Sequence, residues 1–285
     1  MILVTGAAGK TGRAVMRALM SSGVEARALV HRKEQVESAY ALGAHEAIVA
    51  DLGIPETLTP GFRGVEKVYH ICPNVSPDEI TFGMNAIHAA QMSGVEHFVY
   101  HSVLHPQTEA MPHHWKKLRV EEGLLQSGLP FTILRPTAYM QNIQTHWQTI
   151  LEKNIYPVPY PVETRLSLVD LEDVAEAAAI VMTREDHLGS TYELVGTTPL
   201  SQIEIAATLS QVLGVPIRAV RQDHADWERS ARDRGLGNYQ IEALIKMFEY
   251  YEHYAFEGNP HITEWLLGRS PVTLTDFIQR TISSG

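Results

Sequence analysis

The chain has 285 residues, of which 45% are hydrophobic and 20% are charged, an ordinary composition for a soluble globular protein. Acidic residues outnumber basic ones by 33 to 23, which argues against a nucleic-acid-binding surface. Cys72 is the only cysteine, and neither a signal peptide nor an apolar run of membrane-spanning length is found. We therefore expect a cytoplasmic protein with no nucleic-acid or membrane partner, and the oligomeric state stays open.

The N-terminal stretch predicts a short buried strand at residues 2–4, a glycine-rich turn, and a helix from about residue 13. Free backbone N–H groups and the helix dipole would together form an anion site there. Gly6 permits the sharp turn, Gly9 lets a pyrophosphate approach the backbone, and Gly12 lets the helix pack on the strand. The expected dinucleotide contacts are Gly6, Ala8, Gly9, Lys10, Thr11 and Gly12.

Two alternatives apply to this turn. Many tight strand-to-helix turns hold no ligand, so the glycines could be purely structural. A nucleotide-hydrolysing P-loop is the other alternative, and it needs four residues between its two glycines. Only Ala7 and Ala8 separate Gly6 from Gly9, which excludes it.

A second strand is predicted at residues 24–30, and a basic cluster follows it directly. In a dinucleotide fold an acid at this point binds the ribose 2′-hydroxyl, whereas a basic residue accommodates a 2′-phosphate. Arg32 suits a phosphate because its guanidinium is a planar fork, and Lys33 can assist it. The alternative is a solvated basic cluster that only ends the strand. We expect NADP(H) as the cofactor.

The next two strands are expected to border the cofactor with their C-terminal ends. Residues 34–42 predict a helix, residues 46–50 a strand, residues 54–64 a short connection, and residues 65–71 another strand. Asp51 could equally be a turn or helix-capping residue. In open parallel sheets, ligands lie outside the carboxyl ends of the strands. The contacts expected on this ground are Asp51 and Leu52 at the adenine, and Cys72, Pro73 and Asn74 in the turn after the second strand.

Strand and helix continue to alternate as far as residue 135, which predicts a doubly wound parallel sheet. Helices are expected at 78–93 and 113–127, and strands at 95–101 and 130–134. The pattern then changes. The sequence predicts a helix over 137–152, an irregular stretch over 154–163, strands at 166–169, 191–195 and 217–220, and helices at 170–182, 199–213, 238–256, 263–267 and 273–283.

This pattern predicts an α/β protein with two lobes. A Rossmann domain would comprise residues 1–135 with returning segments near 164–195. A smaller, mostly helical substrate lobe would comprise residues 136–163 and 196–285.

The motifs together resemble those of the NmrA-like family, atypical members of the short-chain dehydrogenase/reductase superfamily. The resemblance rests on TGAAGKTG at 5–12, Lys-x-x-Val-Glu at 117–121, SGLPFTILRPTAYMQN at 127–142, LVDLEDVA at 168–175 and GSTYELVG at 189–196. These segments cover most of residues 1–215 in the expected order. The resemblance implies a Rossmann domain, a preference for NADP and a small C-terminal lobe.

The resemblance also implies a site around residues 102–142. Lys117 matches the superfamily lysine that holds the nicotinamide ribose, and Ser102 matches its serine. His113 stands where the superfamily has a tyrosine, which departs from the usual pattern, although histidine can donate a proton near neutral pH. Residues i and i+4 share a helical face, so His113 and Lys117 can point the same way. Pro136 and Tyr139 would lie at the cofactor, and Tyr139 and Asn142 at the substrate.

Three functions stay open at this point. The first is an NADPH-dependent oxidoreductase that reduces a quinone or another carbonyl-type small molecule. The second is a non-catalytic NADP(H) sensor that meets a protein partner, since the NmrA-like group contains both kinds. The third, a sugar-nucleotide epimerase, ordinarily needs the missing tyrosine. No metal is expected, because the histidines at 101, 105, 113 and 114 lack zinc-like spacing.

Overall fold

The computed structural model describes residues 1–283, and the chain divides into two compact units. The first unit contains residues 1–109, 113–136 and 174–193. The second contains residues 110–112, 137–173 and the chain from Leu194 onward. The last two residues of the predicted substrate lobe lie outside the described residues.

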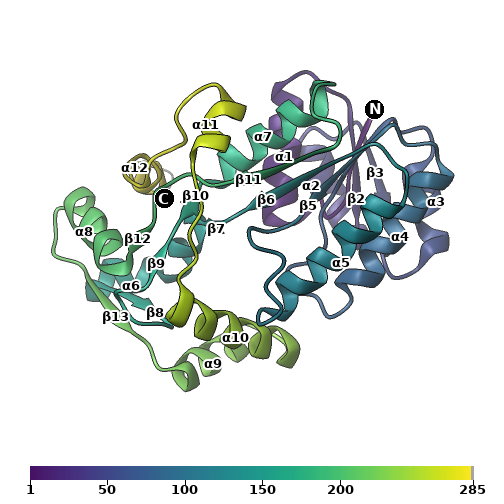
Figure 1. Cartoon of the computed structure of the whole chain (residues 1–285). Coiled ribbons are helices and arrows are strands. Elements are labelled where there is room, and N and C mark those ends of the chain that lie inside the picture. Colours follow the sequence, from purple (N-terminus) through teal and green to yellow (C-terminus); the bar gives the residue numbers. More distant parts are fainter. Residues whose placement is uncertain (284–285) are drawn as a thin grey trace. The chain divides into compact units, whose positions relative to one another are not determined.

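A seven-stranded sheet forms the centre of the first unit (Figure 1), in the order β11-β6-β5-β4-β1-β2-β3. Neighbouring strands from β3 to β6 pair in parallel, as predicted. The chain runs outward from β1 to β3, then returns to β4 on the other side of β1, so the strand order reverses between β1 and β4. In open parallel sheets, ligands bind outside the carboxyl ends of the strands at such a point. The strands are β1 (Ile2–Val4), β2 (Ala26–Val30), β3 (Glu46–Val49), β4 (Lys67–His70), β5 (His97–His101), β6 (Phe131–Pro136) and β11 (Ser190–Leu194).

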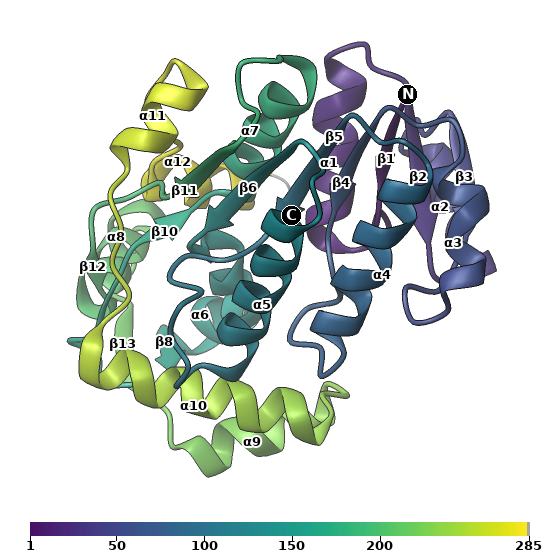
Figure 2. The same ribbon diagram turned by 45° about the vertical axis from the view of Figure 1, so that its right-hand side comes forward.

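Helices cover both faces of this sheet (Figure 2). Side chains of α3, α4 and α5 pack with those of the strands in one buried cluster, which includes Phe62, Phe98 and Val120. Helices α1 and α7 lie on the opposite face. The bounds are α1 (Lys10–Ser21), the 3-10 helix η1 (Lys33–Gln35), α2 (Val36–Ala41), α3 (Pro55–Phe62), α4 (Glu79–Met92), α5 (Pro112–Gln126) and α7 (Leu171–Thr183).

The expectation of a plain connection over residues 54–64 is wrong, because helix α3 occupies most of it. Pro55 stands in the first helical turn, where its missing N–H costs nothing. Leu58 and Phe62 are fully buried in the core. Burial of these two side chains stabilises the helix, although its two prolines and one glycine are unfavourable for helix formation.

The second unit contains three two-stranded pairings, β7 with β10, β9 with β12, and β8 with β13. The expectation of one helix over 137–152 is wrong, since a strand and a 3-10 helix precede the α-helix. Helix α9 was not predicted. The elements are β7 (Ala138–Tyr139), η2 (Met140–His146), α6 (Trp147–Lys153), β8 (Ile155–Val158), β9 (Arg165–Leu166), β10 (Leu168–Val169), β12 (Leu200–Ser201), α8 (Gln202–Leu213), β13 (Arg218–Arg221), α9 (His224–Asp233), α10 (Asn238–Tyr254), α11 (His261–Leu267) and α12 (Leu274–Ser283).

Two fully buried aspartates tie the C-terminal segment into the second unit. Asp173 accepts hydrogen bonds from Arg269 (2.8 Å) and from the backbone N–H of Val272 (2.8 Å). Asp170 pairs with Arg280 of α12. Both carboxylates belong to the motif at 168–175. This motif therefore anchors the C-terminal segment, which contains none of the motifs of the family resemblance. Among residues 1–283, no helix is long and apolar enough to cross a membrane.

Candidate active site

The glycine turn leaves β1 with the geometry that the sequence predicts. Gly6 has a φ of +60°, in the left-handed region, and its carbonyl accepts a hydrogen bond from Gly9 N–H at 2.9 Å. A Cβ atom on Gly12 would lie 2.2 Å from the Gly6 oxygen and 2.7 Å from Ala7 Cα. No side chain fits at Gly12, so α1 begins in close contact with the turn.

The N-terminus of α1 fits an anionic group. Within the described chain, no side chain caps this helix and no acidic residue lies in its first turn. Its first N–H groups therefore have no protein carboxylate or hydroxyl as an acceptor, and the positive end of the helix dipole is uncompensated. Lys10 and Thr11 belong to this turn. The residues present thus suit the pyrophosphate of a dinucleotide.

The turn after β2 presents a basic surface. The side-chain oxygen of Gln35 accepts hydrogen bonds from the backbone N–H groups of His31 (3.1 Å) and Arg32 (2.9 Å), which fixes this turn. The side chains of Arg32 and Lys33 are exposed. A fixed backbone with an exposed guanidinium is an arrangement that can bind a phosphate.

The predicted adenine contacts after β3 have structural roles. Oδ1 of Asp51 accepts a hydrogen bond from Gly53 N–H at 2.7 Å, so Asp51 is a turn residue. It does not cap α3, whose N-cap is Ile54. Leu52 is buried, and its carbonyl accepts a hydrogen bond from the amide of Asn85 at 2.8 Å. A contact of either residue with an adenine remains a proposal.

The turn after β4 divides into a buried and an exposed part. Cys72 is buried, and burial, with the charge of Glu79 as a second cause, raises the pKa of its thiol, so the thiol is protonated and unreactive. Pro73 and Asn74 are exposed at the carboxyl edge of the sheet. Only these two have surface that a cofactor could contact.

Lys117 of α5 lies in a buried polar cluster at the end of β5. Its Nζ donates to Oε1 of Glu79 at 2.9 Å and to the backbone carbonyl of His101 at 3.2 Å. Glu79, the first residue of α4, also accepts a hydrogen bond from the hydroxyl of Tyr100 at 2.8 Å. An ammonium group carries three N–H donors, and two of those of Lys117 have acceptors among residues 1–283, so a third can serve a ligand.

His113 lies one helical turn before Lys117 on α5. Burial and, second, the positive charge of Lys117 lower the pKa of His113 to about 4, so its imidazole is neutral at pH 7. Nδ1 of His113 is buried without a hydrogen-bond partner among the described residues. We therefore place the ring proton on Nε2. The expectation that His113 donates a proton as an acid near neutral pH does not agree with this environment, which favours a neutral hydrogen-bond donor.

Ser102 is buried directly after β5 and faces a carboxylate. Its hydroxyl donates to Oε1 of Glu121 at 2.5 Å, and the guanidinium of Arg135 donates two hydrogen bonds to Glu121, at 2.6 and 3.1 Å. A hydroxyl carries a single proton. Because the hydroxyl donates its one hydrogen bond to Glu121, the arrangement favours a structural role for Ser102.

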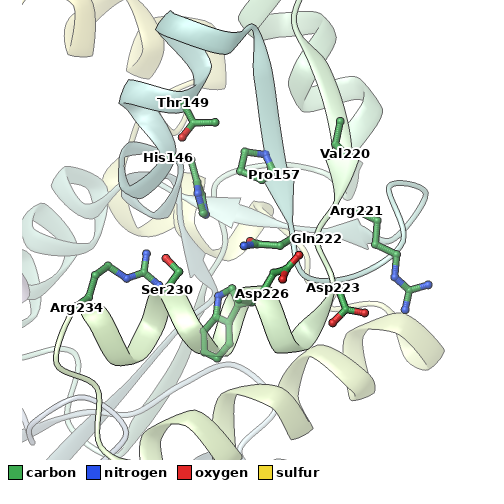
Figure 3. Close-up of a pocket in the computed structure, with 11 residues that line it drawn as sticks. His146, Thr149, Pro157, Val220, Arg221, Gln222, Asp223, Asp226, Ser230 and Arg234 are labelled. Carbon is green, nitrogen blue, oxygen red and sulfur yellow. The ribbon is translucent and has the colours of Figure 1, made fainter.

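The remaining predicted residues lie at the start of the second unit or just before it. Pro136 ends β6 and is buried, Tyr139 ends β7 and is half-buried, and Asn142 is exposed on η2. The second unit also contains a pocket of about 370 Å³ (Figure 3), which none of the predicted site residues line. His146, Gln222, Asp226 and Arg234 are among its lining residues, so the pocket is polar and carries both charges.

A comparison with protein-family models matches residues 1–281 to one described as the NmrA-like family. The chain belongs to the NmrA-like family. The match covers both units, including residues 216–281, which lie beyond the motifs that supported the resemblance.

Individual proteins are similar to this chain over most or nearly all of its length. An NAD(P)H azoreductase of Xenophilus azovorans is 32% identical over 279 residues, which is 97% of this chain and 96% of the relative. Quinone oxidoreductase 2 of Escherichia coli is 29% identical, covering 83% of this chain and 82% of the relative. Among solved structures, an NADPH-dependent quinone oxidoreductase from Escherichia coli complexed with NADPH is 25% identical and has a TM-score of 0.87, covering 99% of this chain and all of that one.

The residues that form hydrogen bonds and ion pairs with the predicted site residues could not be identified from the sequence. Glu79 looked like an ordinary acidic residue in the first turn of an amphipathic helix, and Tyr100 like a buried strand residue. Glu121 lies in a motif that supported the family resemblance, but the motif gave no sign of its pairing with Arg135. These contacts join the consecutive elements α4, β5, α5 and β6 through residues that lie 14 to 38 positions apart in the sequence.

Proposed function

We propose that this NmrA-like chain reduces a quinone or another carbonyl-type small molecule with a hydride from NADPH. The enzyme class, an NAD(P)H-dependent oxidoreductase, and the cofactor, NADP(H), are confirmed by the relatives described above. The acceptor is our proposal. The observation that carries it is the occurrence, in one unit, of a dinucleotide cradle and of a charged lysine beside a neutral histidine on α5.

The cradle would bind the cofactor through two anionic groups. The open N–H groups at the start of α1 would hold the pyrophosphate, with Gly9 allowing close approach. Arg32, with help from Lys33, would bind the 2′-phosphate that distinguishes NADPH from NADH. When bound, NADPH supplies the hydride, and the protein supplies binding and orientation.

Lys117 would hold the nicotinamide ribose. Its ammonium group is fixed by Glu79 and by the carbonyl of His101, so its remaining donor has a defined position. A fixed donor keeps the reacting carbon in one orientation, which is the usual contribution of a positioning group.

His113 would stabilise the charge that develops on the acceptor oxygen. Quinone reduction takes one hydride, that is two electrons and one proton, and one further proton. A neutral imidazole donates a hydrogen bond to the developing oxyanion through Nε2 but keeps its proton, so the further proton comes from water. Tyr139 and Asn142 remain proposed substrate contacts, and Ser102 is left out of the chemistry.

A screen of quinone, aldehyde and azo-dye acceptors with NADPH tests this proposal. We expect oxidation of NADPH with at least one quinone, and a loss of about tenfold or more in kcat in Lys117→Met, because a positioned charge-assisted hydrogen bond is removed. Tight NADPH binding without turnover of any acceptor would overturn the proposal and favour the NADP(H)-sensing alternative. An NADH-dependent activity of equal rate would contradict the role of Arg32.

A further inference from the structure

The proposed mechanism uses Lys117 but leaves Glu79, the buried carboxylate beside it, unexplained. Glu79 is only 2% exposed, and Oε1 receives both the Lys117 ammonium at 2.9 Å and the Tyr100 hydroxyl at 2.8 Å. The side chain of Lys117 is 15% exposed. A long, flexible side chain keeps one direction only where fixed partners hold its head group, and an ammonium so far out of water also needs a counter-charge. Glu79 provides that counter-charge.

We propose that Glu79 is a positioning residue for the hydride-transfer site, which holds the Lys117 ammonium in one position, aimed at the carboxyl edge of the sheet. This inference rests on the function proposed above, because it assumes that Lys117 binds the cofactor. Glu79 itself lies under Lys117 and is buried, so it acts through the lysine.

The other groups around the pair do not carry charge near neutral pH. Burial lowers the pKa of His70 to about 4 and that of His101 to about 3, so both rings are neutral, as is His113. Burial raises the pKa of the Cys72 thiol and of the Tyr100 hydroxyl, so both stay protonated.

The pair is therefore a single charged unit in a neutral surrounding. Burial would raise the pKa of Glu79, but the charge of Lys117 and the hydrogen bonds from Lys117 and Tyr100 outweigh it, so the pKa lies below its usual value. Replacing Glu79 with a neutral residue leaves the buried ammonium without compensation. Lys117 would then lack both its counter-charge and the acceptor that fixes its direction, which is a change that NADPH binding can report.

The chain contains a matched control for this substitution. Glu121 is as deeply buried as Glu79, is paired with Arg135 at 2.6 Å, and lies on the same helix as Lys117. Glu121→Gln therefore removes a buried ion pair of the same helix without touching the acceptor of Lys117.

The test is calorimetric titration of the full-length protein with NADPH at pH 7. We expect wild type and Glu121→Gln to bind NADPH with nearly equal affinity. In Glu79→Gln, affinity should fall by about tenfold, because the charge-assisted hydrogen bond from a fixed Lys117 is lost. The double variant Glu79→Gln/Lys117→Met should bind no more weakly than Lys117→Met alone, because Glu79 acts only through the lysine.

A Glu79→Gln affinity equal to that of wild type would overturn the inference, and so would a double variant in which the two losses add. If Glu79→Gln does not fold, Glu79→Asp serves instead, since the shorter carboxylate should weaken NADPH binding by a smaller factor, and only while Lys117 is present. The readout is binding alone. A protein that binds NADPH with the expected affinities but reduces no acceptor would contradict the proposed function and leave the role of Glu79 intact.

Discussion

The hydroxyl of Ser102 donates a hydrogen bond to the carboxylate of Glu121 across 2.5 Å. This contact does not agree with the catalytic role that was expected for Ser102. The same carboxylate accepts two hydrogen bonds from Arg135. The three residues join β5, β6 and α5 beneath the site. A serine in this position supports the helix that carries Lys117 and His113.

Ser102→Ala should therefore reduce stability more than activity. Loss of a hydrogen bond to a buried charged group should lower the free energy of unfolding by about 2 kcal/mol. Activity with NADPH and a quinone should stay within about threefold of wild type, far from the 10²–10³-fold loss, roughly, that follows removal of an oxyanion donor. Urea unfolding and steady-state kinetics measure the two effects. A large fall in kcat with unchanged stability would show that Ser102 takes part in catalysis.

Arg32→Ala should weaken NADPH binding and leave NADH binding unchanged. The exposed guanidinium follows a fixed turn after β2 and is the proposed partner of the 2′-phosphate, which NADH lacks. We expect a loss of about tenfold or more for NADPH, measured by calorimetry. Arg17→Ala is the control, because Arg17 is an exposed arginine of α1 and its removal changes the net charge equally. Equal losses for both cofactors would contradict the assignment.

Gly12→Ala should abolish cofactor binding and destabilise the first unit. The added Cβ would meet the Gly6 carbonyl oxygen at 2.2 Å, and backbone atoms cannot move aside as a flexible side chain can. The cost of such overpacking is about 3 kcal/mol. Gly237→Ala is the control, since the nearest atom to its added Cβ is the Gln240 side-chain oxygen at 3.9 Å. A Gly12→Ala protein with normal melting and normal NADPH affinity would show that the turn tolerates a side chain.

Stability should fall between pH 7 and pH 5 because buried histidines must stay neutral. Burial lowers the pKa of His70 to about 4 and that of His101 to about 3, against about 6.5 in an unfolded chain. The unfolded state therefore binds more protons below pH 6.5, and the stability present above this pH is lost as the pH falls. Each histidine should contribute a slope of up to about 1.4 kcal/mol per pH unit.

Guanidinium unfolding at pH 7, 6 and 5 measures this slope. The variant His70→Asn should show a shallower dependence, whatever its absolute stability. An unfolding free energy that is equal at pH 7 and pH 5 would contradict the neutral, buried state of these rings.

The sequence predicted the first βαβ unit well because its signals are local. The glycines at 6, 9 and 12 and the adjacent apolar pattern specify a turn that needs no distant partner. Helix α3 was missed for the opposite reason. Its segment PETLTPGF has two prolines and a glycine, and the helix depends on burial of Leu58 and Phe62 against strands elsewhere in the chain.

In the predicted site, too, features set by local signals were predicted, and features set by contacts with other elements were not. The positions of Lys117 and His113 on one helix followed from their spacing and from the family resemblance. The neutrality of His113, the pairing of Ser102 with Glu121, and the burial of Glu79 could not be predicted. Each depends on which side chains the sheet brings beside it, and an acidic residue that begins a helix is usually exposed to water.

The most direct test of the account is a single-turnover experiment with NADPH, prepared with hydrogen or deuterium at the transferred position of C4. The protein is premixed with the cofactor, a quinone is added in a stopped-flow instrument, and the nicotinamide absorbance at 340 nm is followed. We expect a fall in absorbance that is slower with the deuterated cofactor and slower still in Lys117→Met. An absorbance that stays constant while NADPH remains bound would contradict hydride transfer on this chain.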